Sequence, residues 1–186
     1  PTKDKFLGIG DIVSIDEQYS VFVRKAENAQ LAIGVVSTRP GYLLGENIQD
    51  LYPSENFVPV ALAGRVPVKV IKNQNEAIKA GDLITISSYP GIGALANKAG
   101  PVIGKALENN SYWNEQTCPF APSVEEIIWP EDDGSNFAKP CFRLPDNTYI
   151  GKIMVFINLS WYDPDVYLTS TGELQITQAD TKENTN

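Results

Sequence analysis

The side chains that most often carry catalysis and metal binding are scarce in this chain. Its 186 residues include no histidine and only two cysteines, beside 23 aspartates and glutamates. Without histidine the chain lacks the usual general base, the Ser–His and Cys–His nucleophile pairs and the commonest transition-metal ligand. Two cysteines alone cannot complete a structural zinc site. The sequence therefore predicts no catalytic residue set, no cofactor and no metal.

The carboxylates do not form a pattern that points to one reaction. Asp132-Asp133-Gly134-Ser135-Asn136 offers several oxygens near a glycine, as calcium loops do, but the closing glutamate of the full calcium-loop spacing is missing. Asp163-Pro164-Asp165 is typical of a solvated turn. Paired carboxylates can perform acid–base catalysis, yet nothing in the sequence ties two of them to one cleft. We therefore expect no carboxylate-based active site.

Cys118 and Cys141 bracket one loop-like segment. Each lies next to a proline, in a segment that we expect to be irregular and exposed, which favours a disulfide formed in an oxidising compartment. The alternative is a pair of unrelated buried thiols.

Length and charge limit the class of protein. A chain of 186 residues suits one substantial domain. The net charge of −8 argues against a nucleic-acid partner, which needs clustered Lys and Arg. No apolar run approaches the roughly 20 residues of a membrane helix, so we expect no membrane insertion. The chain begins at Pro1 without Met, and we expect it to be a piece of a longer protein.

Short β-branched runs separated by polar turns predict an all-β fold. In the run from Val66 to Val70 the apolar residues alternate with Pro67 and Lys69, which is the period of a strand with one buried face. No long helical period occurs. Other expected strands lie in the ranges 6–15, 19–25, 30–37 and 81–86.

Several pieces of the chain occur twice in the same order, which predicts an internal duplication. The matched pairs are Gly10–Ile15 with Gly81–Ile86, Lys25-Ala26 with Lys98-Ala99, Ile33–Val36 with Ile103–Ala106, and Gly64–Val70 with Gly151–Ile157. The alternative is chance matching of short pieces. On this interpretation residues 1–176 form a single β domain of two copies, each of about four strands, over about 8–71 and 79–160. A long insertion at about 108–149 interrupts the second copy, and 177–186 is a disordered tail.

Gly10, Asp11, Gly81 and Asp82 are predicted to form turns rather than a site. Glycine adopts backbone conformations that other residues resist, and an aspartate side chain can accept hydrogen bonds from the amides of its own turn.

The insertion is the expected recognition surface, because long loops in a compact domain often bind partners. It contains the aromatic residues Tyr112, Trp113, Trp129 and Phe142, which could stack on a ligand such as a glycan. The alternative is a self-packed cap that buries these side chains within the loop.

Residues Gly10–Ser14, Arg24–Ala26 and Ile33–Ser37 resemble the self-cleaving intramolecular-chaperone domain at the C-terminus of phage neck-appendage and tail-spike proteins. Pro59–Val68 and Gly151–Tyr162 are similar to related domains of bacterial and phage surface proteins. The resemblance covers roughly 8–107 and 150–176 and leaves out the cysteine-bearing insertion. It implies a compact β-sandwich or barrel-like (β-clip-like) domain that forms a homotrimer and helps a fibrous stem to fold.

Three functions follow as hypotheses. The first is a non-enzymatic, trimer-forming assembly module of a phage or bacterial surface appendage, such as a tail fibre or spike, that contacts neighbouring fibre modules. The second is an autoproteolytic chaperone domain, although its acidic cleavage residues have no match here. The third is a carbohydrate-binding module that uses the aromatic insertion. In each case we expect an extracellular, virion-surface or cell-surface location.

Overall fold

The β-branched runs of the sequence form strands, as expected. The computed structural model describes residues 7–19, 22–37, 40–44, 57–73, 76–130 and 140–176. Within these ranges the regular structure is β-strand apart from one short 3-10 turn, η1 (Ala29–Leu31). The predicted all-β fold class is confirmed. None of the described residues belongs to a helix long and apolar enough to cross a membrane.

The first sheet contains four short strands in the order β2-β1-β3-β4. All its pairings are antiparallel, and β1 pairs with both β2 and β3. A register shift between Val13 and Ser14 places a bulge in the pairing of β1 with β3. The strands are β1 (Ile12–Ile15), β2 (Val23–Lys25), β3 (Ala32–Val36) and β4 (Val60–Ala61).

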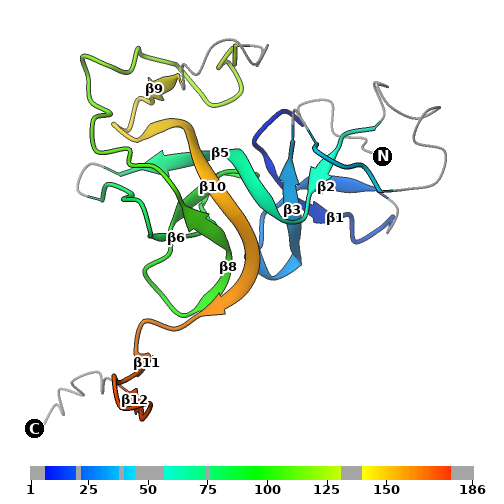
Figure 1. The fold of residues 1–186 in the computed structure, drawn as a ribbon. Helices are drawn as coiled ribbons and strands as arrows, with labels where there is room; N and C mark the ends of the chain where they lie inside the picture. The colour runs from blue at the N-terminus through cyan, green and yellow to red at the C-terminus, as the bar shows by residue number, and fades with distance from the viewer. Residues whose placement is uncertain are drawn as a thin grey trace, which may run out of the picture.

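The second sheet has the order β5-β7-β6-β8-β10-β9, and a further pairing of β5 with β10 joins its two sides. Because β5 and β10 each also pair with another strand of this sheet, β5, β7, β6, β8 and β10 close into a small barrel, with β9 outside it (Figure 1). Its strands are β5 (Gly64–Lys72), β6 (Leu83–Ile86), β7 (Gly93–Leu95), β8 (Gly100–Ala106), β9 (Cys141–Arg143) and β10 (Tyr149–Tyr162).

Backbone hydrogen bonds join the first sheet to the barrel. The N–H of Lys69 in β5 donates to the carbonyl of Gly10 at 2.9 Å, and the N–H of Ile12 donates to the carbonyl of Gly91 at 2.8 Å. A large apolar cluster continues across the junction, with Ile12 and Val35 from the first sheet and Val68 from the barrel all buried. The two sheets therefore share one core, in agreement with a sandwich-like arrangement.

The insertion covers a second, smaller core. Its Ala121 and Ile127, with Leu144 after β9, are buried against Ile71 of β5 and Ile150 of β10. This part of the insertion thus packs on the outer side of the β5–β10 pair, whereas Trp113 and both cysteines of the insertion belong to the main core.

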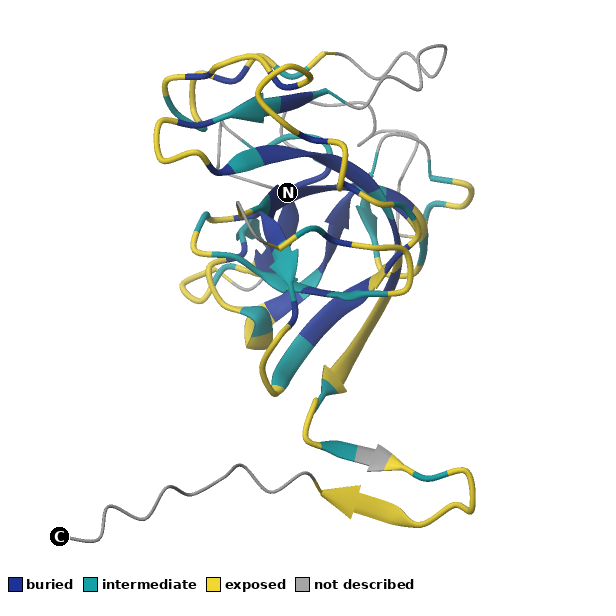
Figure 2. Ribbon diagram, turned by 90° about the vertical axis from the view of Figure 1, so that its left-hand side faces the viewer, coloured by how far each residue is buried: buried dark blue, intermediate teal, exposed yellow. Residues whose placement is uncertain are grey.

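The chain leaves the barrel through the far end of β10 and forms a separate two-stranded hairpin. Its strands are β11 (Val166–Leu168) and β12 (Leu174–Ile176), which pair only with each other among the described strands. Figure 1 and Figure 2 both show this hairpin standing away from the body. The predicted disordered tail, 177–186, lies outside the described residues.

The Gly10-Asp11 and Gly81-Asp82 turns are built alike. Both glycines have positive φ, 85° and 100°. In each turn the aspartate carboxylate accepts from the N–H three residues earlier, at 2.8 Å from Gly8 and 2.7 Å from Lys79. The aspartate N–H returns a bond to the carbonyl of the same residue, at 3.0 Å in both turns. All four residues thus occupy turns, as expected.

Strand pairing aligns the two halves differently from the sequence matches. Ala26 and Ala96 donate in the same way to the first residues of β1 and β6, at 2.9 and 2.8 Å, so Ala96 rather than Ala99 corresponds to Ala26. Similarly, Val36 of β3 pairs with Val60, and Ala106 of β8 pairs with Val155. If β3 is compared with β8, the residue that corresponds to Val60 is therefore Val155, whereas the sequence match had compared Gly64 with Gly151. The duplication itself stays a prediction.

Two glycines at equivalent strand positions allow close approach of the neighbouring strand. A Cβ added to Gly34 would collide with the carbonyl oxygen of Ala61, and one added to Gly104 with that of Phe156. We expect Gly34→Ala and Gly104→Ala each to lower the free energy of unfolding by about 1–3 kcal/mol, because the strands would have to separate. Urea unfolding followed by tryptophan fluorescence measures this.

Gly100→Ala is the matched control for this prediction. Gly100 lies in the same strand as Gly104, but a Cβ there meets no atom within 4 Å. An equal loss of stability for Gly100→Ala and Gly104→Ala would contradict the close-approach explanation.

Candidate functional site

The most unusual chemistry in the described structure is a buried ion pair between Asp11 and Lys69. The Lys69 ammonium nitrogen lies 2.6 Å from Oδ1 of Asp11, and the two side chains are 6% and 1% exposed. Oδ2 of Asp11 accepts from the N–H of Gly8 at 2.8 Å and lies 3.8 Å from Nζ of Lys25. Among the described residues, Asp11 is the only buried carboxylate, and both of its oxygens are engaged.

Lys69 is the residue that the sequence pattern misplaced. The alternation along β5 predicts Val66, Val68 and Val70 on the buried face and Lys69 on the other, and the three valines are indeed buried. However, Lys69 is buried as well, because the turn at Gly10 covers the other face of β5. The sequence assigned the Asp11 carboxylate only to hydrogen bonds with amides of its own turn, and so it did not predict the ion pair with Lys69.

The insertion places the aromatic ring of Trp129 beside this ion pair. Nζ of Lys69 lies 5.0 Å from the ring centroid of Trp129, and Nζ of Lys152 lies 5.2 Å from the same ring. Lys152 is the direct cross-strand partner of Lys69 in the β5–β10 pair, and it is also buried. Trp129 is held in turn by an edge-to-face contact with Phe142, at 5.5 Å between centroids. The Trp129 ring therefore contacts two ammonium groups from adjacent strands.

The surroundings lower the pKa of Lys69 below its ordinary value, chiefly because burial removes the hydration of its ammonium group. The Asp11 carboxylate opposes this shift by attraction and by its hydrogen bond. A lysine of this kind can serve as a base or nucleophile when a substrate can reach it. Two cavities among the described residues, of about 460 and 540 Å³, are lined by neither Lys69 nor Asp11. The arrangement is instead suited to tying the first sheet to the barrel.

The four aromatic residues proposed for recognition do not form one surface. Tyr112 is exposed, whereas Trp129 and Phe142 are half-buried and contact each other. Trp113 is fully buried, with its ring edge against Gly151 of β10, where an added Cβ would lie 2.7 Å from the indole. The expectation that Trp113 takes part in recognition is therefore wrong: its ring fills the space that the missing glycine side chain leaves.

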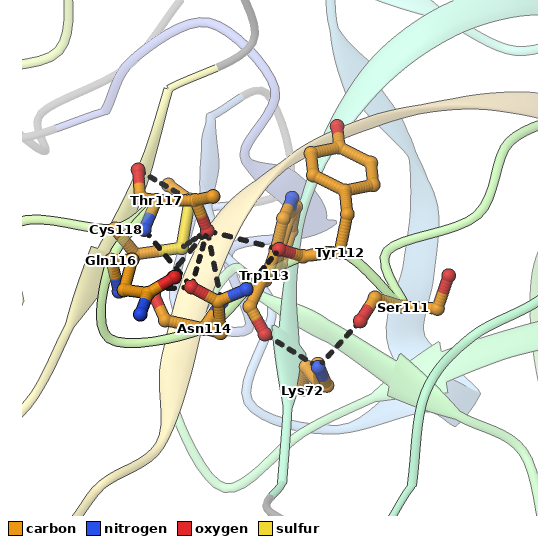
Figure 3. The surroundings of a disulfide bond; sticks show 9 residues. Lys72, Ser111, Tyr112, Trp113, Asn114, Gln116, Thr117 and Cys118 are labelled. Carbon is orange, nitrogen blue, oxygen red and sulfur yellow. Dashed lines mark hydrogen bonds between the residues drawn. A yellow bond between two sulfur atoms is a disulfide. The ribbon is translucent and has the colours of Figure 1, made fainter.

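Cys118 and Cys141 are joined by a disulfide within the insertion, which fastens the first part of this segment to β9 (Figure 3). Around it, the Asn114 and Thr117 side chains bond the backbone of the same loop. Lys72 of β5 reaches the loop as well, since its ammonium donates to the carbonyl of Trp113 at 2.6 Å and to that of Ser111 at 3.1 Å. Together these bonds hold Trp113 in its buried position.

The remaining acidic segments give no metal site that the structure can describe. Asp132–Asn136 lies outside the described residues. In the Asp163–Asp165 segment, the Asp163 carboxylate accepts from the N–H of Asp165 at 3.0 Å, as in a turn. Within the described ranges no three His, Cys, Asp or Glu side chains are grouped so that they could hold a metal ion.

One end of the molecule exposes an apolar surface that the sequence reading did not single out. Leu159 and Trp161 at the far end of β10 are 42% and 65% exposed, and Leu168, Leu174 and Ile176 of the hairpin are 64–69% exposed. Figure 2 shows the far end of β10 and β12 in the colour of exposed residues. The available signal was the weak alternation of Leu174 and Ile176 just beyond Trp161. We call Leu159 and Trp161 the β10 end.

The Asp11–Lys69 pair generates a stability prediction. Asp11→Ala leaves the Lys69 ammonium buried without its carboxylate, so we expect the free energy of unfolding to fall by about 3–5 kcal/mol. Adding Lys69→Met to Asp11→Ala should recover part of that loss, because the double variant buries no unpaired charge. Denaturant unfolding of the wild type, both single variants and the double variant measures the coupling.

Asp82→Ala is the control for this cycle. Asp82 occupies the equivalent turn and accepts from the N–H of Lys79, so its loss should cost about 0.5–1.5 kcal/mol. If Asp11→Ala costs no more than Asp82→Ala, the ion pair adds nothing beyond the turn itself.

The disulfide generates a second prediction. It closes a loop with a sequence separation of 23 residues, so replacing both cysteines with alanine should lower the free energy of unfolding by about 3 kcal/mol. A reducing agent should destabilise the wild type by a similar amount and leave the Cys118→Ala/Cys141→Ala variant unchanged. Equal stability of the oxidised wild type and this variant would show that the cross-link does not constrain the chain.

Comparison of the chain with protein-family models, with curated proteins and with solved structures found no match.

Proposed function

We propose that this chain is a non-enzymatic structural module of a phage or bacterial surface appendage, and that it acts by associating with copies of itself as a homotrimer. The observation that carries the proposal is that the β10 end and the hairpin each expose large apolar side chains. Large exposed apolar patches on a folded chain are typical of protein–protein interfaces. A two-stranded hairpin is also at best marginally stable in water without further packing.

The chemistry of the buried groups supports a structural role. The Asp11 carboxylate is occupied by Lys69, Gly8 and Lys25, so it is poorly placed to cut the backbone. The Cys118–Cys141 disulfide supports an oxidising environment, such as a virion or cell surface. The trimeric state and the appendage context come from the resemblance of the sequence to phage chaperone and surface domains.

Solution mass tests this proposal. Light scattering coupled to size exclusion should give three times the chain mass of 20.4 kDa. The same measurement on a chain extended upstream should show an intact product, because no self-cleavage is expected. A monomer at high concentration would refute self-association. Shortening of the extended chain would instead favour the autoproteolytic alternative.

A further inference from the structure

The β11–β12 hairpin has one apolar face. Its register sets Val166 opposite Ile176 and Leu168 opposite Leu174. Directly opposed residues point to the same side of a sheet, as do residues two apart on one strand, so these four side chains share one face. Leu168, Leu174 and Ile176 are each about two-thirds exposed. The hairpin therefore presents an uncovered apolar face to its surroundings.

The turn of the hairpin is well bonded. The N–H of Thr169 donates to the carbonyl of Glu173 at 2.8 Å, and the N–H of Glu173 returns a bond to Oγ1 of Thr169 at 3.0 Å. Gly172 provides the positive φ of 83° that this turn requires. The apolar face is thus displayed on a formed element rather than on irregular chain.

A short, restrained link directs the hairpin away from its own barrel. Only Asp163, Pro164 and Asp165 separate β10 from β11. The proline fixes one backbone angle, and the Asp163 carboxylate and carbonyl accept from the N–H groups of Asp165 and Val166 at 3.0 and 3.4 Å. Within the described residues, neither hairpin strand pairs with a strand of the body. A short hinge of this kind favours exchange of an element between chains over folding back.

The same chain also offers a matching apolar surface. Leu159 and Trp161 lie two residues apart on β10, so they point to one side of that strand, and both are exposed. We propose that the β11–β12 hairpin is an exchanged arm whose apolar face docks on the β10 end of a second copy of this chain. Arm-to-body contacts are head-to-tail, so they close into a ring when each copy gives one arm and receives one.

This inference rests on the proposed self-association, and a complementation experiment separates the two. One full-length variant carries a damaged arm, Leu168→Lys/Leu174→Lys, and a second carries a damaged receptor, Leu159→Lys/Trp161→Lys. All four positions are exposed, so each variant should fold, which circular dichroism and cooperative unfolding verify. Each alone should shift from the wild-type mass of three chains to that of one. Their equimolar mixture should give a complex of two chains, because one intact arm meets one intact receptor.

Matched controls and a second measurement complete the test. Asn158→Lys adds the same charge in β10 next to the receptor residue Leu159, and Gln175→Lys adds it on the other face of the arm. Each of these control variants should keep the wild-type mass of three chains. In an otherwise wild-type chain, Trp161→Cys/Leu174→Cys should form disulfide-linked chains on oxidation, seen as multiples of the chain mass on a non-reducing gel.

Each other outcome overturns the inference in a distinguishable way. Variants that keep the mass of three chains would leave self-association standing and reject the arm as its cause. Variants that stay separate on mixing would also reject exchange. A wild-type chain that is monomeric would reject the proposed self-association and the exchanged arm together, and a Trp161→Cys/Leu174→Cys chain that links only within itself would show that the arm folds back.

Discussion

The antiparallel pairing of β5 with β10 is the constraint on which the rest of this structure depends. It runs without interruption from Gly64 opposite Ile157 to Lys72 opposite Tyr149. It closes the barrel, and it brings together strands that are far apart in the sequence. The main core lies on one side of this pair, and the smaller core under the insertion lies on the other. Both the buried lysines and the disulfide-bonded loop take their positions from it.

Charge burial in this protein is a consequence of that pairing. Lys69 and Lys152 are cross-strand neighbours, and both are buried under the N-terminal turn and the insertion. Burying an ammonium group is costly unless it is paired and hydrogen-bonded, and Asp11 and the Trp129 ring supply favourable contacts here. The turn around Asp11 is therefore fixed by a side chain from the middle of the barrel as well as by its own amides.

The two ends of β10 have different surroundings. Near Ile150 the strand is flanked by β5 and β9 and is covered by the insertion. Beyond the register shift between Ile157 and Ser160 it pairs with β8 alone, and its side chains become exposed. The hairpin continues from this uncovered end. An assembly surface here would leave the disulfide-bonded insertion at the opposite end of the strand, where it is free of that contact.

Local pattern alone determined the fold class, the strand-forming runs and the two Gly-Asp turns. Period-two alternation and turn residues act over a few neighbouring positions, so they can be read directly from Val66–Val70 or from Gly10-Asp11. The tertiary structure decided that both faces of β5 are covered around Lys69, that Trp113 is buried, and that the N–H of Ala96 bonds to the first residue of β6. Each of these depends on a segment distant in the sequence: the N-terminal turn over Lys69, Gly151 making room for an indole, and the pairing of β6 with its neighbours. The exposed apolar face of the hairpin could not be predicted from the sequence for the same reason. Whether a side chain is exposed depends on which distant segments pack against its strand, and the residues of the strand alone do not determine this.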